Sequence, residues 1–241
     1  MNYYFVTGSS KGLGKALAEL LLKNENNFVF GYSRSSSIID KGYYHKHLDF
    51  SNLETVQKLK FPELKDAEQV VLINNAGVVG EIKHVGNLSS QKIIDCYNVN
   101  LVVPSILTNE FVKTYRGTVP KILIINISSG ASQSAIDGWS VYCTSKAGID
   151  MFSKVLHEES IINNTNIKVL SIAPGIIDTE MQKEIRNADF SNFSNVNRFV
   201  EYKKNGDLAT AEETAIKIVH FLAHPNFSQN VVCSVRDLTN Q

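Results

Sequence analysis

The stretch YYFVTGSSKGLGKALAELLL, residues 3–22, decides the fold. Residues 3–6 are aromatic or β-branched and predict a strand, and residues 15–22 have the apolar spacing of a helix. Between them, Gly8, Gly12 and Gly14 predict a tight turn. Many glycine-rich turns bind nothing, but this turn lies between a strand and a helix, where a pyrophosphate can bind at the helix N-terminus. We therefore predict a dinucleotide-binding turn whose other contacts are Ser10, Lys11 and Leu13.

Strands and helices alternate along the rest of the chain. Apolar runs predict strands at 27–32, 43–48, 69–73, 121–127, 167–173 and 229–235, and helical spacing predicts helices at 52–60, 88–115, 139–162 and 210–223. The fully apolar runs are typical of parallel strands that are buried on both faces. We predict an α/β Rossmann-type fold, a doubly wound parallel sheet of about seven strands in a single domain over residues 1–241.

The stretch 176–208 is long and polar, and we expect it to be an irregular insertion that forms a substrate loop. Aromatic residues are spaced along it from Phe190 to Tyr202. They either form a lid over the substrate or pack into a small cluster of their own.

The end of the second predicted strand bears on the choice of cofactor. An acidic residue there would bind the ribose 2′-hydroxyl of NAD, whereas an arginine accommodates the 2′-phosphate of NADP. The sequence has Ser33 and Arg34 at this place, and Lys11 supplies a second cation from the glycine turn. This pattern favours NADP(H), although both cations are also compatible with ordinary solvated surface charges.

Composition excludes several classes of protein. The 241 residues carry no net formal charge and 43% are hydrophobic, which argues against disorder and gives no reason to expect a nucleic-acid or membrane partner. The N-terminus lacks the pattern of a signal peptide, and the three cysteines have no close pairing, so we expect a cytoplasmic protein with reduced thiols. The histidine pairs His45/His47 and His220/His224 lack further ligands, and we predict no metal site.

The stretch Trp139-Ser-Val-Tyr142-Cys-Thr-Ser-Lys146 contains the candidate chemistry. Residues four apart share a helix face, so the phenol and the ammonium can reach one cleft. A nearby ammonium lowers the pKa of a phenol and would make Tyr142 a general acid. Taken alone, the pair is more typical of a half-buried tyrosine beside a solvated lysine than of a catalytic pair.

Five motifs in one order give the pattern more weight. They are the glycine turn, Asn74-Asn75-Ala76-Gly77, Ser129, Tyr142-x-x-x-Lys146 and Pro174-Gly175. With these motifs the whole chain resembles the short-chain dehydrogenase/reductase family. The C-terminal Val235-Arg-Asp237-Leu resembles the sepiapterin-reductase-like branch, which includes bacterial benzil reductases.

The resemblance implies a catalytic role for four residues. Tyr142 matches the acid/base, and Lys146 matches the lysine that lowers the pKa of the tyrosine and binds the nicotinamide ribose. Ser129, rather than Ser128, matches the serine that binds the substrate carbonyl. Asn100, with Asn98 as the alternative, matches the asparagine whose helix backbone holds a relay water.

The resemblance also assigns the binding residues. It implies that the cofactor cleft includes Asp49, Phe50, Asn75, Ala76, Gly77, Pro174, Gly175, Ile177 and Thr179. Trp139, Ser129 and Asp237 are candidate substrate residues, and Asp237 could equally be paired with Arg236 or a backbone amide.

The resemblance thus implies an NADPH-dependent carbonyl reductase for a hydrophobic ketone or diketone, such as a benzil-like compound or a pterin side-chain carbonyl. The alternatives are a non-catalytic dinucleotide-binding redox sensor and an NAD-dependent alcohol dehydrogenase. The family also suggests a homodimer or homotetramer formed through the helices that contain Asn100 and Tyr142.

Overall fold

A computed structural model describes residues 1–223 and 230–239 and contains one parallel sheet of seven strands. The strands lie in the order β3-β2-β1-β4-β5-β6-β7, as the predicted doubly wound sheet requires. Their bounds are Asn2–Thr7 (β1), Asn27–Ser33 (β2), Tyr43–His47 (β3), Gln69–Asn74 (β4), Lys121–Ile127 (β5), Ile167–Ala173 (β6) and Val232–Ser234 (β7). The predicted α/β fold is confirmed.

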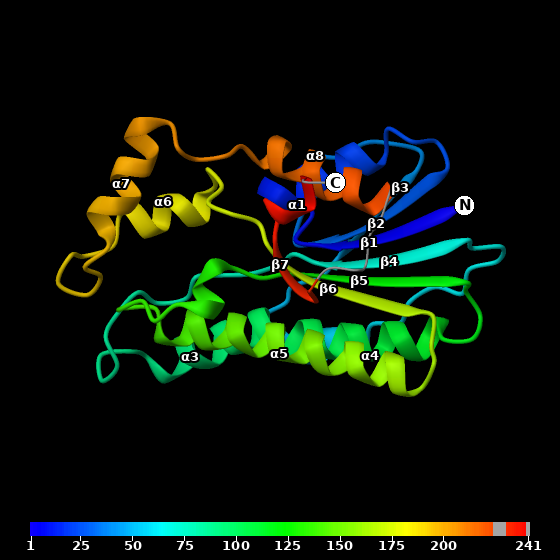
Figure 1. Ribbon diagram of the computed structural model, residues 1–241, viewed down its shortest axis with the longest axis horizontal. Coiled ribbons are helices and arrows are strands. Elements are labelled where there is room, and N and C mark those ends of the chain that lie inside the picture. Colours follow the sequence, from blue (N-terminus) through cyan, green and yellow to red (C-terminus); the bar gives the residue numbers. More distant parts are fainter. Residues whose placement is uncertain (224–229, 240–241) are drawn as a thin grey trace.

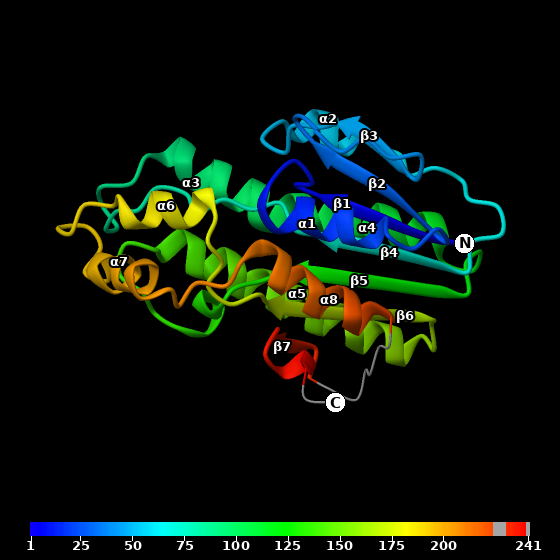
Figure 2. The ribbon, with the colours of Figure 1, turned by 90° about the horizontal axis from the view of Figure 1, so that it is seen from above.

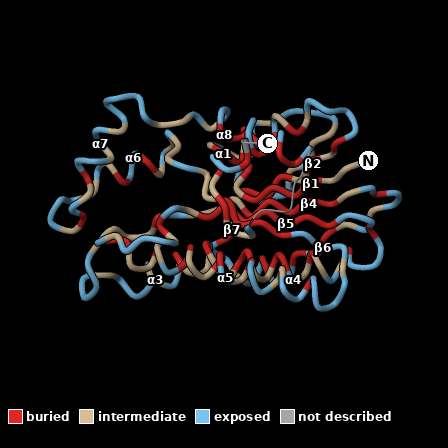
Figure 3. Tube along the Cα trace, viewed as in Figure 1, coloured by how far each residue is buried: buried red, intermediate tan, exposed pale blue. Residues whose placement is uncertain are grey.

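Helices cover both faces of this sheet (Figures 1 and 2). On one face lie α1 (Gly12–Leu21) and α8 (Ala211–Ala223), and on the other lie α2 (Leu53–Gln57), α3 (Ser90–Tyr97), α4 (Val103–Tyr115) and α5 (Ser140–Ile162). Alternate residues of the central strands face the two layers: Val71 and Ile73 pack with α1 and α8, and Val70 and Leu72 pack with α4. The sheet is therefore the most deeply buried part of the molecule (Figure 3).

The strand order reverses between β1 and β4, and ligands of doubly wound sheets bind at such a switch point. Thr7 joins the carboxyl ends of the two strands. Its Oγ1 accepts hydrogen bonds from the backbone N–H groups of Asn75 at 2.9 Å and Ala76 at 3.0 Å. In return, Asn75 Nδ2 donates to the Thr7 carbonyl at 2.9 Å. The glycine turn and the Asn75-Ala76-Gly77 motif are thereby fixed to each other.

The predicted helix over 88–115 is a continuous run in three parts. A π-helical segment, η1 (Asn98–Val102), separates α3 from α4. Pro104 has no N–H and cannot donate the ordinary helical hydrogen bond to the carbonyl of Asn100, four residues earlier. The π segment lies where that bond is missing.

The stretch expected to be irregular contains two helices, so that part of the prediction is wrong. They are α6 (Glu180–Arg186) and α7 (Val196–Asn205), and both lie beyond the carboxyl ends of the strands (Figure 1). The last strand, expected over 229–235, is limited to Val232–Ser234; residue 229 itself lies outside the described residues.

Candidate active site

A cavity of about 1570 Å³ follows the carboxyl ends of the strands and continues toward α6 and α7. All five sequence motifs contribute to its wall. The predicted residues that line it are Gly8, Ser10, Lys11, Gly12, Leu13, Ser33, Arg34, Asp49, Phe50, Asn75, Ala76, Gly77, Ser129, Trp139, Tyr142, Lys146, Pro174, Gly175, Ile177, Thr179 and Asp237. The two remaining candidates, Gly14 and Asn100, are buried behind this wall.

The glycine turn has the backbone that a dinucleotide site needs. Gly8 and Gly12 have φ angles of +69° and +54°, which residues with side chains rarely adopt. A Cβ on Gly14 would lie 2.3 Å from the carbonyl oxygen of Gly8. Gly14 therefore lets α1 pack against the turn, while Gly12 and Leu13 bring the first turn of α1 to the cavity wall. These residues fit a bound pyrophosphate.

The ends of β2 and β3 form the wall expected to face the adenosine. Arg34 and Lys11 are exposed and line the same cavity. Ser33 is buried, and its Oγ lies 3.2 Å from Ser9 Oγ and 3.1 Å from His45 Nε2. Two hydrogen bonds from Ser51 are the main cause of a lowered pKa of Asp49, and the charge of Arg34 adds to them.

Tyr142 is buried at the centre of the cavity wall, 7% exposed. Burial raises its pKa to about 12, and a hydrogen bond with Ser129 acts in the opposite direction. The sequence predicted a pKa lowered by Lys146, whereas in the structure the pKa of Tyr142 is raised because loss of solvent is the largest of its causes. The phenol is therefore protonated at neutral pH and can donate. Ser128 Oγ is buried without a hydrogen-bond partner among the described residues, so Ser129 is the serine joined to the tyrosine.

Lys146 lies one helical turn beyond Tyr142 with its Nζ 5.9 Å from the centre of the phenol ring. Its Nζ donates to the carbonyl oxygen of Ile127, at the end of β5, at 2.8 Å. The lysine is 5% exposed, and burial lowers its pKa to about 8, while interactions with Cys96 and Asp150 act in the opposite direction. The structure thus brings the predicted pair together in one cleft.

Asn100 is held rigidly behind this pair, within η1. Its Oδ1 accepts from the backbone N–H of Val78 at 2.9 Å, and its Nδ2 donates to the Val78 carbonyl at 2.8 Å. A Cβ on Gly77 would lie 3.4 Å from Asn100 Oδ1 and 3.5 Å from Lys146 Nζ, so the three residues adjoin. Asn98, the alternative candidate, lies at the start of the same segment and is less buried.

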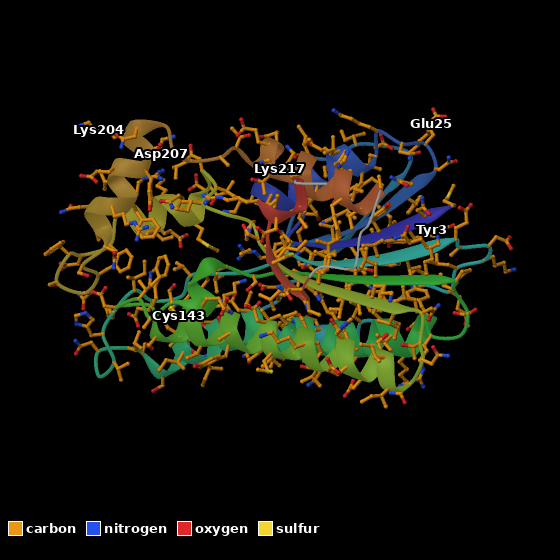
Figure 4. All side chains as sticks on the ribbon, viewed as in Figure 1. Tyr3, Glu25, Cys143, Lys204, Asp207 and Lys217 are labelled. Carbon is orange, nitrogen blue, oxygen red and sulfur yellow. The ribbon has the colours of Figure 1, made fainter. Side chains whose placement is uncertain are left out.

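The far end of the cavity is aromatic. Trp139 contacts the Tyr142 ring edge-on at 5.3 Å and stacks on Phe193 at 5.0 Å. Phe193 is fully buried in this cluster and Phe199 packs against it, whereas Phe190 is 60% exposed. Within 190–202, only part of the aromatic series lines the cavity, namely Phe199 and Tyr202. Figure 4 shows α6 and α7 near the end of α5 that carries Cys143.

Sequence reasoning missed several residues of the site. Arg198 of α7 lines the cavity, beside the Tyr202 already considered as part of a lid, and Asp150 is buried one turn beyond Lys146. Asp150 lies at the same four-residue spacing that identified the pair Tyr142 and Lys146, so the spacing could have found it. Asp237 lines the cavity and accepts a hydrogen bond from the backbone N–H of Ser234 at 2.8 Å, the backbone pairing considered as its alternative.

The described part of the chain has neither a metal site nor a membrane-spanning helix. Within residues 1–223 and 230–239, no group of three or more histidine, cysteine or acidic side chains has the arrangement of a metal site; His224 lies outside these residues. No helix in the same ranges combines the length and apolarity needed to cross a bilayer.

Comparison with known proteins agrees with this geometry. The family model described as short chain dehydrogenase matches residues 2–189. A benzil reductase ((S)-benzoin forming) of Bacillus cereus is 33% identical over 247 residues, covering 98% of this chain and 99% of the relative. A sepiapterin reductase of Meriones unguiculatus is 28% identical, covering 92% and 91%. The solved KRED1-Pglu enzyme has a TM-score of 0.83 at 27% identity, covering 97% of this chain and 100% of that one. The chain therefore belongs to the short-chain dehydrogenase family of oxidoreductases, in the benzil- and sepiapterin-reductase-like branch, and acts on CH–OH or C=O groups.

Proposed function

We propose that this protein is an NADPH-dependent carbonyl reductase that acts on hydrophobic aromatic ketones or diketones of the benzil type. The observation that carries the proposal is the arrangement around Tyr142. A buried, protonated phenol is hydrogen-bonded to Ser129, faces Lys146 and contacts an aromatic wall through Trp139. This arrangement supports proton donation to the oxygen of an aromatic carbonyl compound.

In this proposal the hydroxyl groups of Ser129 and Tyr142 donate hydrogen bonds to the carbonyl oxygen of the substrate. Negative charge develops on that oxygen as the carbon is reduced, and donors already in position stabilise it. When bound, the nicotinamide supplies the hydride that the carbon receives. Tyr142 transfers its phenolic proton to the oxygen, which yields the alcohol. The Lys146 ammonium stabilises the resulting phenolate, and Asn100 holds the Val78 backbone beside it.

The choice of NADPH rests on charge at the adenosine end. Arg34 and Lys11 are both exposed to the cavity, and Ser33 stands where an acidic residue would bind the 2′-hydroxyl of NAD. A 2′-phosphate placed here would meet two cations. An NAD-dependent dehydrogenase has no such use for them.

The proposal of an aromatic substrate rests on the end of the cavity that lies away from the adenosine wall. Trp139, Phe199 and Tyr202 give the cavity an aromatic wall beside Tyr142. We propose that the segment 176–208 closes over the substrate and that aromatic rings of the substrate pack on this wall. A role for Asp237 in binding a pterin is less well supported, because one of its carboxylate oxygens already accepts from Ser234.

We propose that this chain assembles with further copies of itself as a homodimer or homotetramer. Apolar side chains on the outer face of α5 support it: Met151 is 58% exposed and Val155 is 47% exposed.

The test is the oxidation of NADPH in the presence of benzil, followed by absorbance and compared with NADH. We expect turnover with NADPH, and we expect Tyr142→Phe to lower kcat by about a thousandfold because the proton donor is lost. Binding of NADPH, followed by its fluorescence, should change little in this variant.

Turnover that survives Tyr142→Phe would overturn the proposed mechanism. Tight binding of NADPH by the unmodified protein without turnover of benzil or any other carbonyl compound would instead favour a redox sensor.

A further inference from the structure

Among the described residues, two charged side chains are buried, and both are on α5. Lys146 is 5% exposed and Asp150 is 2% exposed; the other buried polar residues in these ranges are uncharged. They are four residues apart, on one face of the helix. An isolated ion in a protein interior is so unfavourable that buried charges are normally compensated by an opposite charge. The two side chains therefore need a common explanation.

Each of these side chains is held by neutral partners, and neither is held by the other. Lys146 Nζ donates to the Ile127 carbonyl at 2.8 Å. Asp150 Oδ1 accepts from Ser171 Oγ at 2.6 Å, and its Oδ2 accepts from Gln133 Nε2 at 3.3 Å. These hydrogen bonds orient both groups but cancel no charge. Compensation acts through the space between them, where solvent is excluded and charge is poorly screened.

We propose that Asp150 is a positioning residue, the counter-charge that keeps Lys146 protonated at neutral pH. The inference rests on the proposed function, in which the Lys146 ammonium stabilises the Tyr142 phenolate. A neutral lysine would still fit its place against Ile127 but would give the phenolate no positive charge.

The other groups that face the pair carry no comparable charge. Tyr142 and Cys96 face Lys146, and Cys233 of β7 faces Asp150. Burial raises the pKa of Tyr142 to about 12 and that of each of the two thiols to about 11, so all three are neutral at pH 7. Asp150 is thus the anion among the groups that face the lysine, and together with Cys96 it acts against the lowering of the Lys146 pKa by burial.

Two other charges lie at the edge of this group. Lys154 is exposed one turn beyond Asp150, where solvent screens it, and Asp237 faces Cys233 from the C-terminal end. Of these, Lys154 is the natural control, because it is as far along the helix from Asp150 as Lys146 is.

The direct test is the titration of Lys146 in protein labelled with [13C]lysine, followed by NMR, with Lys146→Met used to assign its signal. We expect a midpoint near pH 8 in the unmodified protein. Asp150→Asn should lower that midpoint by about one unit or more, because the buried ammonium loses its compensation. Ser171→Ala, which removes a partner of Asp150 and keeps the charge, and Lys154→Met should leave the midpoint within a few tenths of a unit.

An unchanged Lys146 midpoint in folded Asp150→Asn protein would overturn the proposal and leave Asp150 a purely structural role. If Asp150→Asn does not fold, the isosteric pair Asp150→Glu and Asp150→Gln makes the same comparison. The Gln variant should have the lower midpoint, and equal midpoints would overturn the proposal.

A kinetic measurement separates this inference from the function on which it rests. If benzil is reduced, the alkaline limb of the kcat–pH profile should move to lower pH in Asp150→Asn by the same interval as the NMR midpoint. If the alkaline limb of the kcat–pH profile stayed in place while the NMR midpoint of Lys146 moved, the link between Asp150 and catalysis would be overturned. Absence of turnover in the unmodified protein would refute the proposed function, and the NMR titration would still decide whether Asp150 and Lys146 are coupled.

Discussion

The two ends of the cavity are built in different ways. At the dinucleotide end, the contacts are mainly with backbone atoms. A Cβ on Gly14 would lie 2.3 Å from the Gly8 carbonyl oxygen, and the Thr7 hydroxyl accepts hydrogen bonds from the backbone N–H groups of Asn75 and Ala76. At the proposed substrate end, aromatic side chains pack on one another, as Trp139 stacks on Phe193. At the first end, Gly14 has no room for a side chain. The second depends on burial, which many combinations of apolar residues can supply.

The largest effect should come from adding one carbon at the dinucleotide end. We expect Gly14→Ala to lower the free energy of unfolding by about 4 kcal/mol or more, since the new methyl group would overlap the Gly8 carbonyl and Asn75 Nδ2. Urea denaturation measures this change. Gly130→Ala is the control, because a Cβ there meets no described atom within 4 Å. Equal stability of the two variants would show that the turn is looser than its geometry indicates.

A smaller effect should follow from removing a ring at the substrate end. Phe193 is fully buried, and we expect Phe193→Ala to cost about 3 kcal/mol, mostly through loosened packing of α6 and α7. KM for the carbonyl substrate should rise while the Kd for NADPH changes little. Phe190→Ala, at a position 60% exposed, should change neither value. If Phe193→Ala weakened NADPH binding as much as substrate binding, the two ends would not be independent.

The smallest effect concerns one surface charge. Arg34→Asp should weaken NADPH binding by about tenfold and leave NADH binding nearly unchanged, because only NADPH carries the 2′-phosphate. Fluorescence titration with both nucleotides measures it. Lys204→Asp, on α7 (Figure 4), makes a comparable charge reversal at a residue outside the cavity wall. An equal loss for both nucleotides would show that Arg34 does not read the phosphate.

The same contrast explains what the sequence could predict. Strands such as 69–73 and 121–127 are continuous apolar runs, and the glycine turn has a spacing that few other structures need, so the sheet and the dinucleotide wall were predictable. Helices α6 and α7 are short and polar, and their position depends on contacts of Phe193 with Trp139, more than 50 residues away. Local pattern contains little information about such contacts.

The sequence predicted which charged residues lie together, but it did not predict the direction in which the pKa of Tyr142 shifts. The spacing placed Tyr142 and Lys146 on one helix face, and the structure confirms that they lie together. How deeply they are buried depends on the surrounding layers, and burial raises the pKa of the tyrosine where the pair alone would lower it. A single polar residue such as Asp150 belongs to none of the five motifs, although its hydrogen bond with Ser171 joins α5 to β6 beside the site.

Trp139 touches Tyr142 on one side and Phe193, between α6 and α7, on the other. A disturbance of the α6–α7 segment therefore reaches the phenol through the indole ring that both contact. In the proposed mechanism, the rate constant of the chemical step should therefore be sensitive to how well a given substrate fills the aromatic end.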